Sequence, residues 1–354
     1  MYADDEGFLY PRIDMDLCVQ CEKCEKACSF SRNVPETNIN QVYAAYHKDD
    51  ILRNESSSGG VFYPLAISVL ENNGIVIGAG FNDDFSVLHK PVSEEEELRQ
   101  LMRSKYVQSD LKGIYQRIEK ELNKGKPVLF SGTPCQVAGI RACFNDAYDN
   151  LYLCEVLCYG VPSPKVYERY LNYLIEKYHS AIAYINFKDK RYGWDYYTTS
   201  INFKSGKSFC RFGGDSYSEF FRKRLSIRYS CFQCPFSLAN SYADISLGDF
   251  YHYEKYTTLE APKNGISCVI IRNMRGEQLF DKIKESLIYE QVDADSYYCN
   301  EKKNGKIAIP EERNSFFQEL NQCGYSSCIH KYSEKTALNK KIKRGIQSIR
   351  LRLR

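Results

Sequence analysis

Four cysteines near the N-terminus have the spacing of an iron–sulfur ligand set. The stretch "CVQCEKCEKAC" places Cys18, Cys21, Cys24 and Cys28 in a C-x2-C-x2-C-x3-C pattern. A tight loop with this spacing lets three thiolates hold one face of a four-iron cubane, as in bacterial ferredoxins. Zinc more often takes two separated cysteine pairs. The motif therefore predicts a 4Fe–4S cluster, with a zinc site or unligated cysteines as the alternatives.

The fourth cysteine of this motif leaves the number of clusters open. In two-cluster ferredoxins the fourth cysteine binds the other cluster, but the sequence holds no second copy of the motif. Ser29 also stands where a proline usually follows. Either Cys28 completes the cluster within its own motif, or this cluster is incomplete and labile.

Four further cysteines are scattered along the chain at positions that a fold could bring together. Cys135 follows a predicted strand at the start of a helix, and Cys158 ends the next predicted strand. Loops at the ends of neighbouring strands can converge on one site, and the pair Cys231 and Cys234 could join them. As alternatives, Cys135 is a buried apolar residue or a nucleophile with a lowered pKa. The C-x2-C pair alone could equally be a zinc half-site, a redox pair or chance.

The elements that would position these cysteines belong to an α/β body. From residue 42 onward helix-like and strand-like patterns alternate, which predicts mixed sheets flanked by helices after a short, ferredoxin-like Cys-rich segment. Ser163 and Pro164 indicate the start of a helix, and Ser93 with Glu96 indicates a capping box at another. The predicted strands include 75–81, 127–130, 151–157, 181–188, 196–203, 207–212, 243–250 and 266–273, and the predicted helices include 111–123, 217–227 and 276–287.

The composition favours a cytoplasmic redox or metal protein. The chain has 354 residues, 43% of them hydrophobic, and no apolar run nears the roughly 18 residues of a membrane span. Its acidic start lacks the apolar region of a signal peptide. Fifteen cysteines in such a chain more often bind metal or do redox chemistry than form disulfides. The net charge of +3 comes from a basic tail, so the acidic body argues against nucleic-acid binding.

Eight motifs occur in the order of a known family. They are "GFLYPRID" with the four-cysteine motif, "SSSGGVF", "KYVQSDL", "FSGTPCQVAGI", "CYGVPSPKVYERYL", "FKDKRYGW", "SCFQCPF" and "ADISLGDF". Together they span about residues 7–290 and resemble the coenzyme F420 hydrogenase/dehydrogenase beta-subunit family. The chain departs from this family at its start, because members often begin with two ferredoxin motifs and this chain has one.

The resemblance implies an iron–sulfur flavoprotein oxidoreductase. Members of this kind bind FAD and a 4Fe–4S cluster and pass electrons between the cluster and an organic two-electron substrate. The core ligands would be Cys135, Cys158, Cys231 and Cys234, with a small-molecule substrate and a ferredoxin or redox partner subunit as partners. The alternatives are a non-catalytic electron-transfer or assembly subunit, and a zinc-stabilised scaffold linked to surface-polysaccharide production.

A serine- and glycine-rich turn is the first candidate for the flavin site. Ser57, Ser58, Gly59 and Gly60 precede a predicted helix. Glycines let the backbone approach a pyrophosphate, and the amides at a helix start favour anions. The alternative is a flexible turn with an ordinary cap. The turn is no Rossmann fingerprint, because G-x-G-x-x-G is absent.

Three other motifs supply the remaining candidate cofactor contacts. These are Lys105, Tyr106, Gln108, Ser109, Gly132, Thr133, Lys190 and Arg191. A cation near the ring would stabilise a reduced flavin, and Gly132 and Thr133 could bring backbone amides to it. Solvent-exposed lysines and charged hairpin ends are the alternatives. Lys188 and Trp194 lie in "FKDKRYGW" and could be a cation and a stacking group, and Asp249 in "ADISLGDF" could be a polar anchor.

The C-terminal tail has a helical apolar period among basic residues. Leu338, Ile342, Ile346, Ile349 and Leu353 recur at spacings of three and four. This pattern fits an amphipathic helix in peripheral contact with an anionic membrane or an acidic partner, and a disordered basic tail fits as well. The expected parts are an iron–sulfur segment (1–35), an N-terminal α/β domain (36–125), a C-terminal α/β domain with the core cluster and flavin (126–300), and the tail (301–354).

Overall fold

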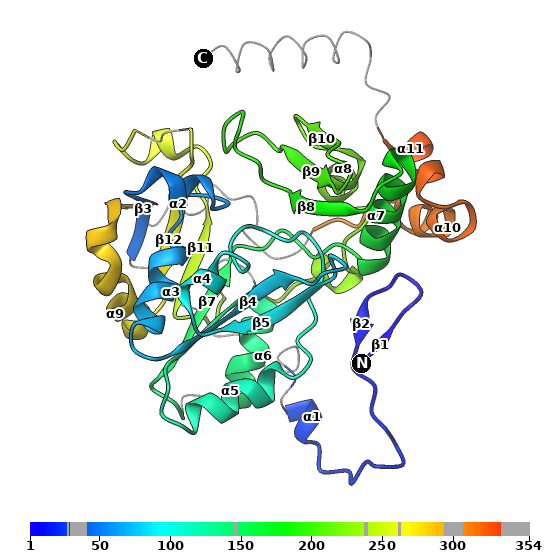
Figure 1. The fold of residues 1–354 in the computed structure, drawn as a ribbon. Coiled ribbons are helices and arrows are strands. Elements are labelled where there is room, and N and C mark those ends of the chain that lie inside the picture. Colours follow the sequence, from blue (N-terminus) through cyan, green and yellow to red (C-terminus); the bar gives the residue numbers. More distant parts are fainter. Residues whose placement is uncertain are drawn as a thin grey trace.

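One eight-stranded mixed sheet organises most of the chain (Figure 1). The computed structural model describes residues 1–26, 28, 41–144, 147–236, 240–260, 263–293 and 307–333. The strand order is β13-β3-β12-β11-β7-β6-β4-β5. In chain order these strands are β3 (Gln41–His47), β4 (Ile75–Phe81), β5 (Val87–Val92), β6 (Val128–Gly132), β7 (Leu151–Val156), β11 (Ile245–Asp249), β12 (Ser267–Ile271) and β13 (Leu287–Val292).

The four central strands leave their carboxyl ends at one edge of the sheet. β4, β6, β7 and β11 pair in parallel. β5 is antiparallel to β4, and β12, β3 and β13 add antiparallel pairs on the other side. This confirms the predicted mixed α/β fold. It also means that the loops after β6, β7 and β11 meet at the same edge, where open α/β sheets place their sites.

Helices cover both faces of this sheet, as the alternation of side chains along each strand requires. The covering helices are α3 (Phe62–Leu70), α5 (Ile114–Leu122), α6 (Pro134–Phe144) and α9 (Met274–Ile283). On β4, Val76 packs in the core that contains α3 and α9, whereas Ile75 and Ile77 pack in the core with α5 and α6. The buried apolar runs predicted as strands are therefore buried from two sides.

A second, three-stranded sheet carries an aromatic core of its own. It contains β8 (Ile182–Asn186), β9 (Thr199–Phe203) and β10 (Ser208–Arg211) in the order β10-β9-β8. The predicted hairpin of β9 and β10 is confirmed by their antiparallel register. The helices packed around this core are α7 (Pro164–Tyr178), α8 (Ser216–Arg222), α10 (Arg313–Cys323) and α11 (Tyr325–Tyr332). Ser163 caps α7 as predicted, because its side chain accepts from the Val166 amide.

The first ten residues are held against this second core. β1 (Tyr2–Ala3) and β2 (Leu9–Tyr10) pair antiparallel. Arg313, 1% exposed, holds the Glu6 carboxylate through both terminal nitrogens, at 2.8 and 2.5 Å. The hydroxyl of Ser163 donates to the Glu6 carbonyl. The N-terminal hairpin is therefore part of the folded body.

The capping box predicted at Ser93 and Glu96 is wrong. The helix there, α4, spans only Glu95–Leu98, begins after an extended Glu94 and has no side-chain cap. It stops early because Leu98 and Leu101 turn into the core and Arg103 takes a left-handed φ of 67°. The short turn brings Arg103 back towards the second sheet.

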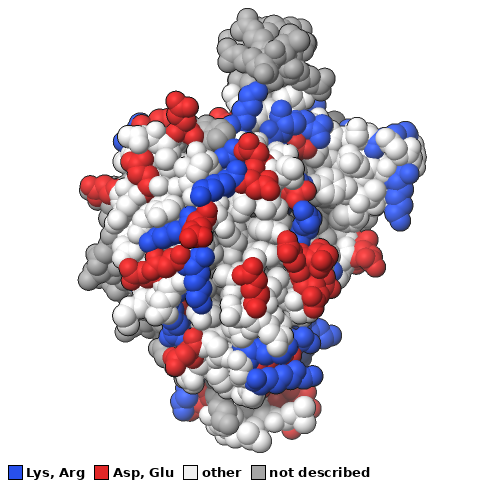
Figure 2. Space-filling view, turned by 60° about the vertical axis from the view of Figure 1, so that its left-hand side comes forward, with Lys and Arg blue, Asp and Glu red and all other residues white. Residues whose placement is uncertain are grey.

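The charge distribution on the surface, the length and polarity of the helices, and the C-terminal tail are relevant to the predicted partners. On the face that Figure 2 shows, basic and acidic side chains are interspersed. Among the described residues, the helices are too short or too polar to cross a bilayer. The tail residues from Leu338 to Leu353 lie outside the described residues, so the amphipathic helix remains a prediction.

Candidate functional site

Two of the four scattered cysteines lie at the carboxyl edge of the parallel strands. Cys135 is in the first turn of α6, directly after β6, and Cys158 follows β7. Cys231 lies in a short 3-10 helix, Tyr229–Phe232, and Cys234 follows it. The segment before this 3-10 helix is fixed next to Cys158, because Pro162 bridges Ile227 and the Arg228 amide donates to the Val161 carbonyl.

The four thiols lie within electrostatic range of one another. Burial, followed by the thiols of Cys158 and Cys234, raises the pKa of Cys135 to about 11. Burial and the other three thiols raise the pKa of Cys231 to about 12. Within the described ranges, no three His, Cys, Asp or Glu side chains are close enough to hold a single metal ion. A cubane does not need that spacing, because each of its four thiolates binds a different iron.

Hydrogen-bond donors and one cation surround these sulfurs. Thr133 Oγ1 lies 3.2 Å from Cys135 Sγ, and the Gly160 amide donates to Cys158 Sγ at 3.4 Å. The Val161 backbone lowers the pKa of Cys231, and Arg228 lowers that of Cys135. The buried Nε of Arg228 has no hydrogen-bond partner in the described part of the chain. Thiolates with nearby donors and a cation are what an anionic iron–sulfur cluster requires, so the donor set fits that group.

The N-terminal cysteines stand apart from this arrangement. Cys21, Cys24 and Cys28 are exposed and Cys18 is half-buried. A four-residue helix, α1 (Lys23–Lys26), lies within the motif, and Gln20 and Glu22 have left-handed φ values of 54° and 56°. The first cluster remains a prediction.

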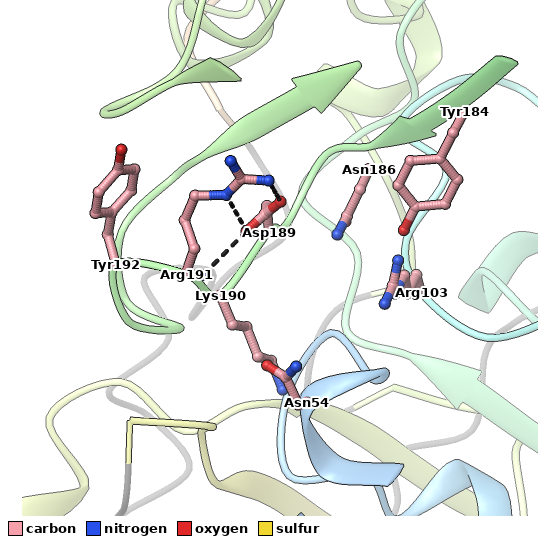
Figure 3. Close-up of a pocket in the computed structure, with 8 residues that line it drawn as sticks. All are labelled: Asn54, Arg103, Tyr184, Asn186, Asp189, Lys190, Arg191 and Tyr192. Carbon is pink, nitrogen blue, oxygen red and sulfur yellow. Dashed lines mark hydrogen bonds and ion pairs between the residues drawn. The ribbon is translucent and has the colours of Figure 1, made fainter. Parts of the chain in front are cut away.

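A polar pocket of about 490 Å³ opens between α2 (Asp50–Asn54) and the second sheet (Figure 3). It is lined by Asn54, Arg103, Tyr184, Asn186, Asp189, Lys190, Arg191 and Tyr192. Its volume is in the range of pockets for small ligands. The guanidinium of Arg103 points into it next to the ring of Tyr184, 5.7 Å from the ring centroid.

The two predicted contacts in this pocket behave differently. Lys190 Nζ donates to three carbonyls, those of Arg53, Ser58 and Asn264, at 2.5 to 2.6 Å. Burial lowers its pKa to about 6, but three acceptors require three hydrogens and so favour the ammonium. Lys190 therefore joins the segments that contain Arg53, Ser58 and Asn264 next to the pocket. Arg191 is half-exposed and pairs with Asp189 at 2.7 Å.

The serine–glycine turn contacts Lys190 through the Ser58 carbonyl. Most of its polar groups form hydrogen bonds with other parts of the protein. The Gly59 amide donates to Ser267 Oγ at 2.9 Å, and Ser58 Oγ donates to the Ile266 carbonyl at 2.7 Å. Ser57 pairs with Ser104. Gly60 has a φ of 85°, which favours glycine. The Gly59 amide therefore has a protein partner, and none of the four turn residues lines the pocket, so their contacts with a flavin remain predictions.

Three of the predicted contacts in "KYVQS" also have protein partners. Lys105 Nζ donates to the carbonyls of Gln100 and Met102, and burial lowers its pKa to about 7. Gln108 pairs with Leu9 of β2, accepting from its amide at 3.0 Å. Ser109 hydrogen bonds His89 at 3.0 Å. These side chains fix the loop, so their flavin contacts remain predictions.

Aromatic side chains connect the pocket with the cysteine site. Tyr159, next to Cys158, lies 5.8 Å from Phe221, and Phe221 lies 5.4 Å from Tyr106. The ring of Tyr106 lies 5.9 Å from that of Phe187. Phe187 follows Asn186, which lines the pocket. The predicted contact of Tyr106 with a cofactor remains a prediction.

Sequence reasoning missed Arg103, Asn54 and Arg228. Arg103 and Asn54 enter the pocket from loop and helix ends, and Arg228 stacks on Tyr10 at 4.1 Å beside the cysteine site. A single arginine in a loop has no local signature. For Arg103, the only sequence signal was its position in "LMRSKY", two residues before the candidate Lys105.

Fold and site together define an α/β protein with convergent thiols at the carboxyl ends of its parallel strands. Residues 125–296 match the family described as the C terminus of the beta subunit of coenzyme F420 hydrogenase/dehydrogenase. A chain in a solved F420-reducing [NiFe] hydrogenase complex from Methanosarcina barkeri is 17% identical, with a TM-score of 0.49 over 72% of this chain and 82% of that one. Curated proteins gave no significant match.

Residues 125–296, slightly less than half of the chain, thus correspond to the C-terminal domain of the coenzyme F420 hydrogenase/dehydrogenase beta subunit. This confirms the resemblance that the eight motifs indicated. The chain is therefore a redox protein of the beta-subunit kind. All four scattered cysteines lie within the matched range.

Proposed function

We propose that this chain is an iron–sulfur flavoprotein oxidoreductase that passes electrons between one or two 4Fe–4S clusters and an organic two-electron substrate through FAD. The convergence of Cys135, Cys158, Cys231 and Cys234 at the carboxyl edge of the sheet is the observation that carries this proposal. The match to a family of hydrogenase and dehydrogenase subunits supports the reaction class.

The four thiols would hold the core cluster, which supplies one-electron transfer when bound. Thr133, Gly160 and Arg228 surround the sulfurs with donors and positive charge. The N-terminal cysteines, Cys18 to Cys28, would hold a second cluster at the surface. A ferredoxin or a redox partner subunit would deliver electrons there.

The polar pocket would hold the phosphate end of FAD, which supplies two-electron chemistry when bound. Arg103 and Arg191 provide cations, and Asn54 and Asn186 provide amide donors. Lys190 holds the loops of the pocket in place. Tyr106 and Phe187 fill the space towards the cysteines and exclude water. The small-molecule substrate and the cytoplasmic location belong to the same proposal.

Anaerobic purification followed by iron, sulfide, zinc and flavin analysis tests this function. We expect about four irons for the core cluster, a broad visible absorption and bound flavin. Cys231→Ser should remove the core iron, whereas Cys143→Ser, on the same helix as Cys135 but exposed, should retain it. Zinc in place of iron would overturn the proposal, and iron without flavin would favour the electron-transfer subunit.

A further inference from the structure

A continuous chain of hydrogen bonds leads from the buried ring of His89 to the sulfur of Cys135. His89 Nδ1 lies 3.0 Å from Ser109 Oγ, and Gln136 Nε2 donates to the same oxygen at 2.8 Å. Gln136 Oε1 lies 3.0 Å from Thr133 Oγ1, which lies 3.2 Å from Cys135 Sγ. Five side chains thus connect β5 with the first turn of α6.

The chemistry of the members fixes the direction of each hydrogen bond. The amide nitrogen of Gln136 can only donate, so Ser109 accepts from it and gives its own hydrogen to His89 Nδ1. His89 then carries its proton on Nε2 and donates it to the Ser131 carbonyl at 3.0 Å. Because the nitrogen of the Gln136 amide faces Ser109, its oxygen must face Thr133.

This orientation changes the usual helix cap at the start of α6. In a capping box the hydroxyl of the cap residue accepts from the amide three residues later. Here the backbone N–H of Gln136 instead donates to the backbone carbonyl of Thr133 at 2.9 Å. The Thr133 amide donates to Gln136 Oε1, also at 2.9 Å. The Thr133 hydroxyl is therefore not needed as a cap and acts as a donor.

Gly132 makes room for this arrangement. A Cβ atom at residue 132 would stand 3.0 Å from Gln136 Oε1 and 2.9 Å from the Phe130 ring. The glycine thus lets the Gln136 side chain fold back over the helix start. This gives Gly132 a packing role, and its predicted contact with a cofactor remains a prediction.

We propose that Thr133 is a positioning residue that donates its hydroxyl hydrogen to Cys135 Sγ and raises the reduction potential of the core cluster. This inference rests on the proposed function. The hydroxyl has one hydrogen and two acceptors, Gln136 Oε1 and Cys135 Sγ. A metal-bound thiolate carries no proton and can only accept, while Gln136 Oε1 keeps the Thr133 amide as a donor. Hydrogen bonds to ligand sulfurs stabilise the more negative, reduced cluster.

The test measures the midpoint potential of the core cluster in chains whose N-terminal motif is disabled by Cys18→Ser, Cys21→Ser and Cys24→Ser. Each chain is titrated anaerobically with dithionite and redox mediators, which supply one electron per cluster, and followed by visible absorption and electron paramagnetic resonance. We expect Thr133→Val to lower the ratio of reduced to oxidised cluster at a fixed potential about tenfold, which corresponds to a fall in midpoint potential of about 59 mV for a one-electron couple.

Two further variants separate this role from general disruption. Thr133→Ser keeps the hydroxyl and should retain the wild-type potential. Gln136→Met removes the competing acceptor and leaves the hydroxyl donating to the sulfur, so the potential should not fall. A fall in potential in all three variants, or none in Thr133→Val, overturns the inference. Absence of iron from the parent chain would instead contradict the proposed function.

Discussion

The ammonium of Lys188 lies 2.5 Å from Oδ2 of Asp249 and joins the second sheet to the end of β11. Lys188 is 4% exposed, and the rings of Trp194 and Tyr251 each lie 5.7 Å from its nitrogen. Burial alone would lower the pKa of Lys188, but Asp249 and neighbouring tyrosines raise it above its ordinary value. The pair is therefore ionised and connects the two sheets beside the pocket.

Lys188→Met should destabilise the fold because it leaves the Asp249 carboxylate without its cation. Breaking a buried pair costs about 3–5 kcal/mol, and the partial exposure of Asp249 reduces this to about 2–3 kcal/mol. The free energy of unfolding in urea measures the effect. Lys188→Met combined with Asp249→Leu should cost less than the two single changes together. Additive costs would show that the pair makes no net contribution.

Stability should fall as the pH falls from about 6.5 towards 4 because His89 is buried in its neutral form. Burial lowers its pKa from 6.5 to about 4. Between pH 6.5 and pH 4, His89 binds a proton in the unfolded chain but not in the folded chain. The contribution of neutral His89 to the free energy of unfolding is therefore complete above pH 6.5 and decreases below it. The loss at pH 5 is about 2 kcal/mol.

Urea unfolding at pH 7 and pH 5 measures the contribution of His89. His89→Gln keeps polar groups near Ser109 and should show a smaller drop in the free energy of unfolding between the two values. His330, which is exposed on α11, provides the control, because His330→Gln should leave the drop unchanged. Equal drops in the wild type and in His89→Gln would contradict the assignment.

Gly59→Ala should be severely destabilising for steric reasons. A Cβ at Gly59 would stand 2.4 Å from the Ala45 carbonyl oxygen and 2.7 Å from the Ser267 amide nitrogen, both backbone atoms. We expect a loss of about 3 kcal/mol or more, seen as a lower thermal midpoint. At Gly125, where φ is 74° and no atom lies within 4 Å, alanine should cost only about 1 kcal/mol. Similar losses at both positions would exclude the packing role.

Arg103→Met should weaken flavin binding at the polar pocket. The side chain points into the pocket, and its loss removes a cation from the proposed phosphate site. We expect FAD affinity to fall about tenfold, as for one lost charge-assisted hydrogen bond, measured by quenching of flavin fluorescence. Arg99→Met is the control, since Arg99 is on the same segment but pairs with Glu55 outside the pocket. Equal affinities in the two variants would place the flavin elsewhere.

The central strands could be predicted because each is a short apolar run buried on both faces. β7 lies within one residue of the predicted 151–157, and β6 begins one residue after and ends two residues after the predicted 127–130. β3 and β13 were missed. "QVYAAYH" mixes polar and aromatic residues, and its partners in β12 and β13 come more than 200 residues later. Such pairing leaves no local pattern to recognise.

The positions of Cys135 and Cys158 at one edge of the sheet could be predicted because each follows one of two consecutive parallel strands, whereas the positions of the nearby cations could not. Arg103 reaches its pocket only because α4 ends at Leu98 and the chain reverses. The failed capping box at Ser93 has the same cause, since burial of Leu98 and Leu101 outweighs helix propensity. Tertiary packing decided both outcomes.

The position of β3 in the sheet has a practical consequence for protein engineering. A fragment cut to the matched range, 125–296, would contain β12 and β13 but lack the strand that lies between them. It would also leave β6 without β4. Both open edges would expose unpaired backbone groups to other molecules, so such a fragment is expected to aggregate, while the full chain closes these edges with strands from its first hundred residues.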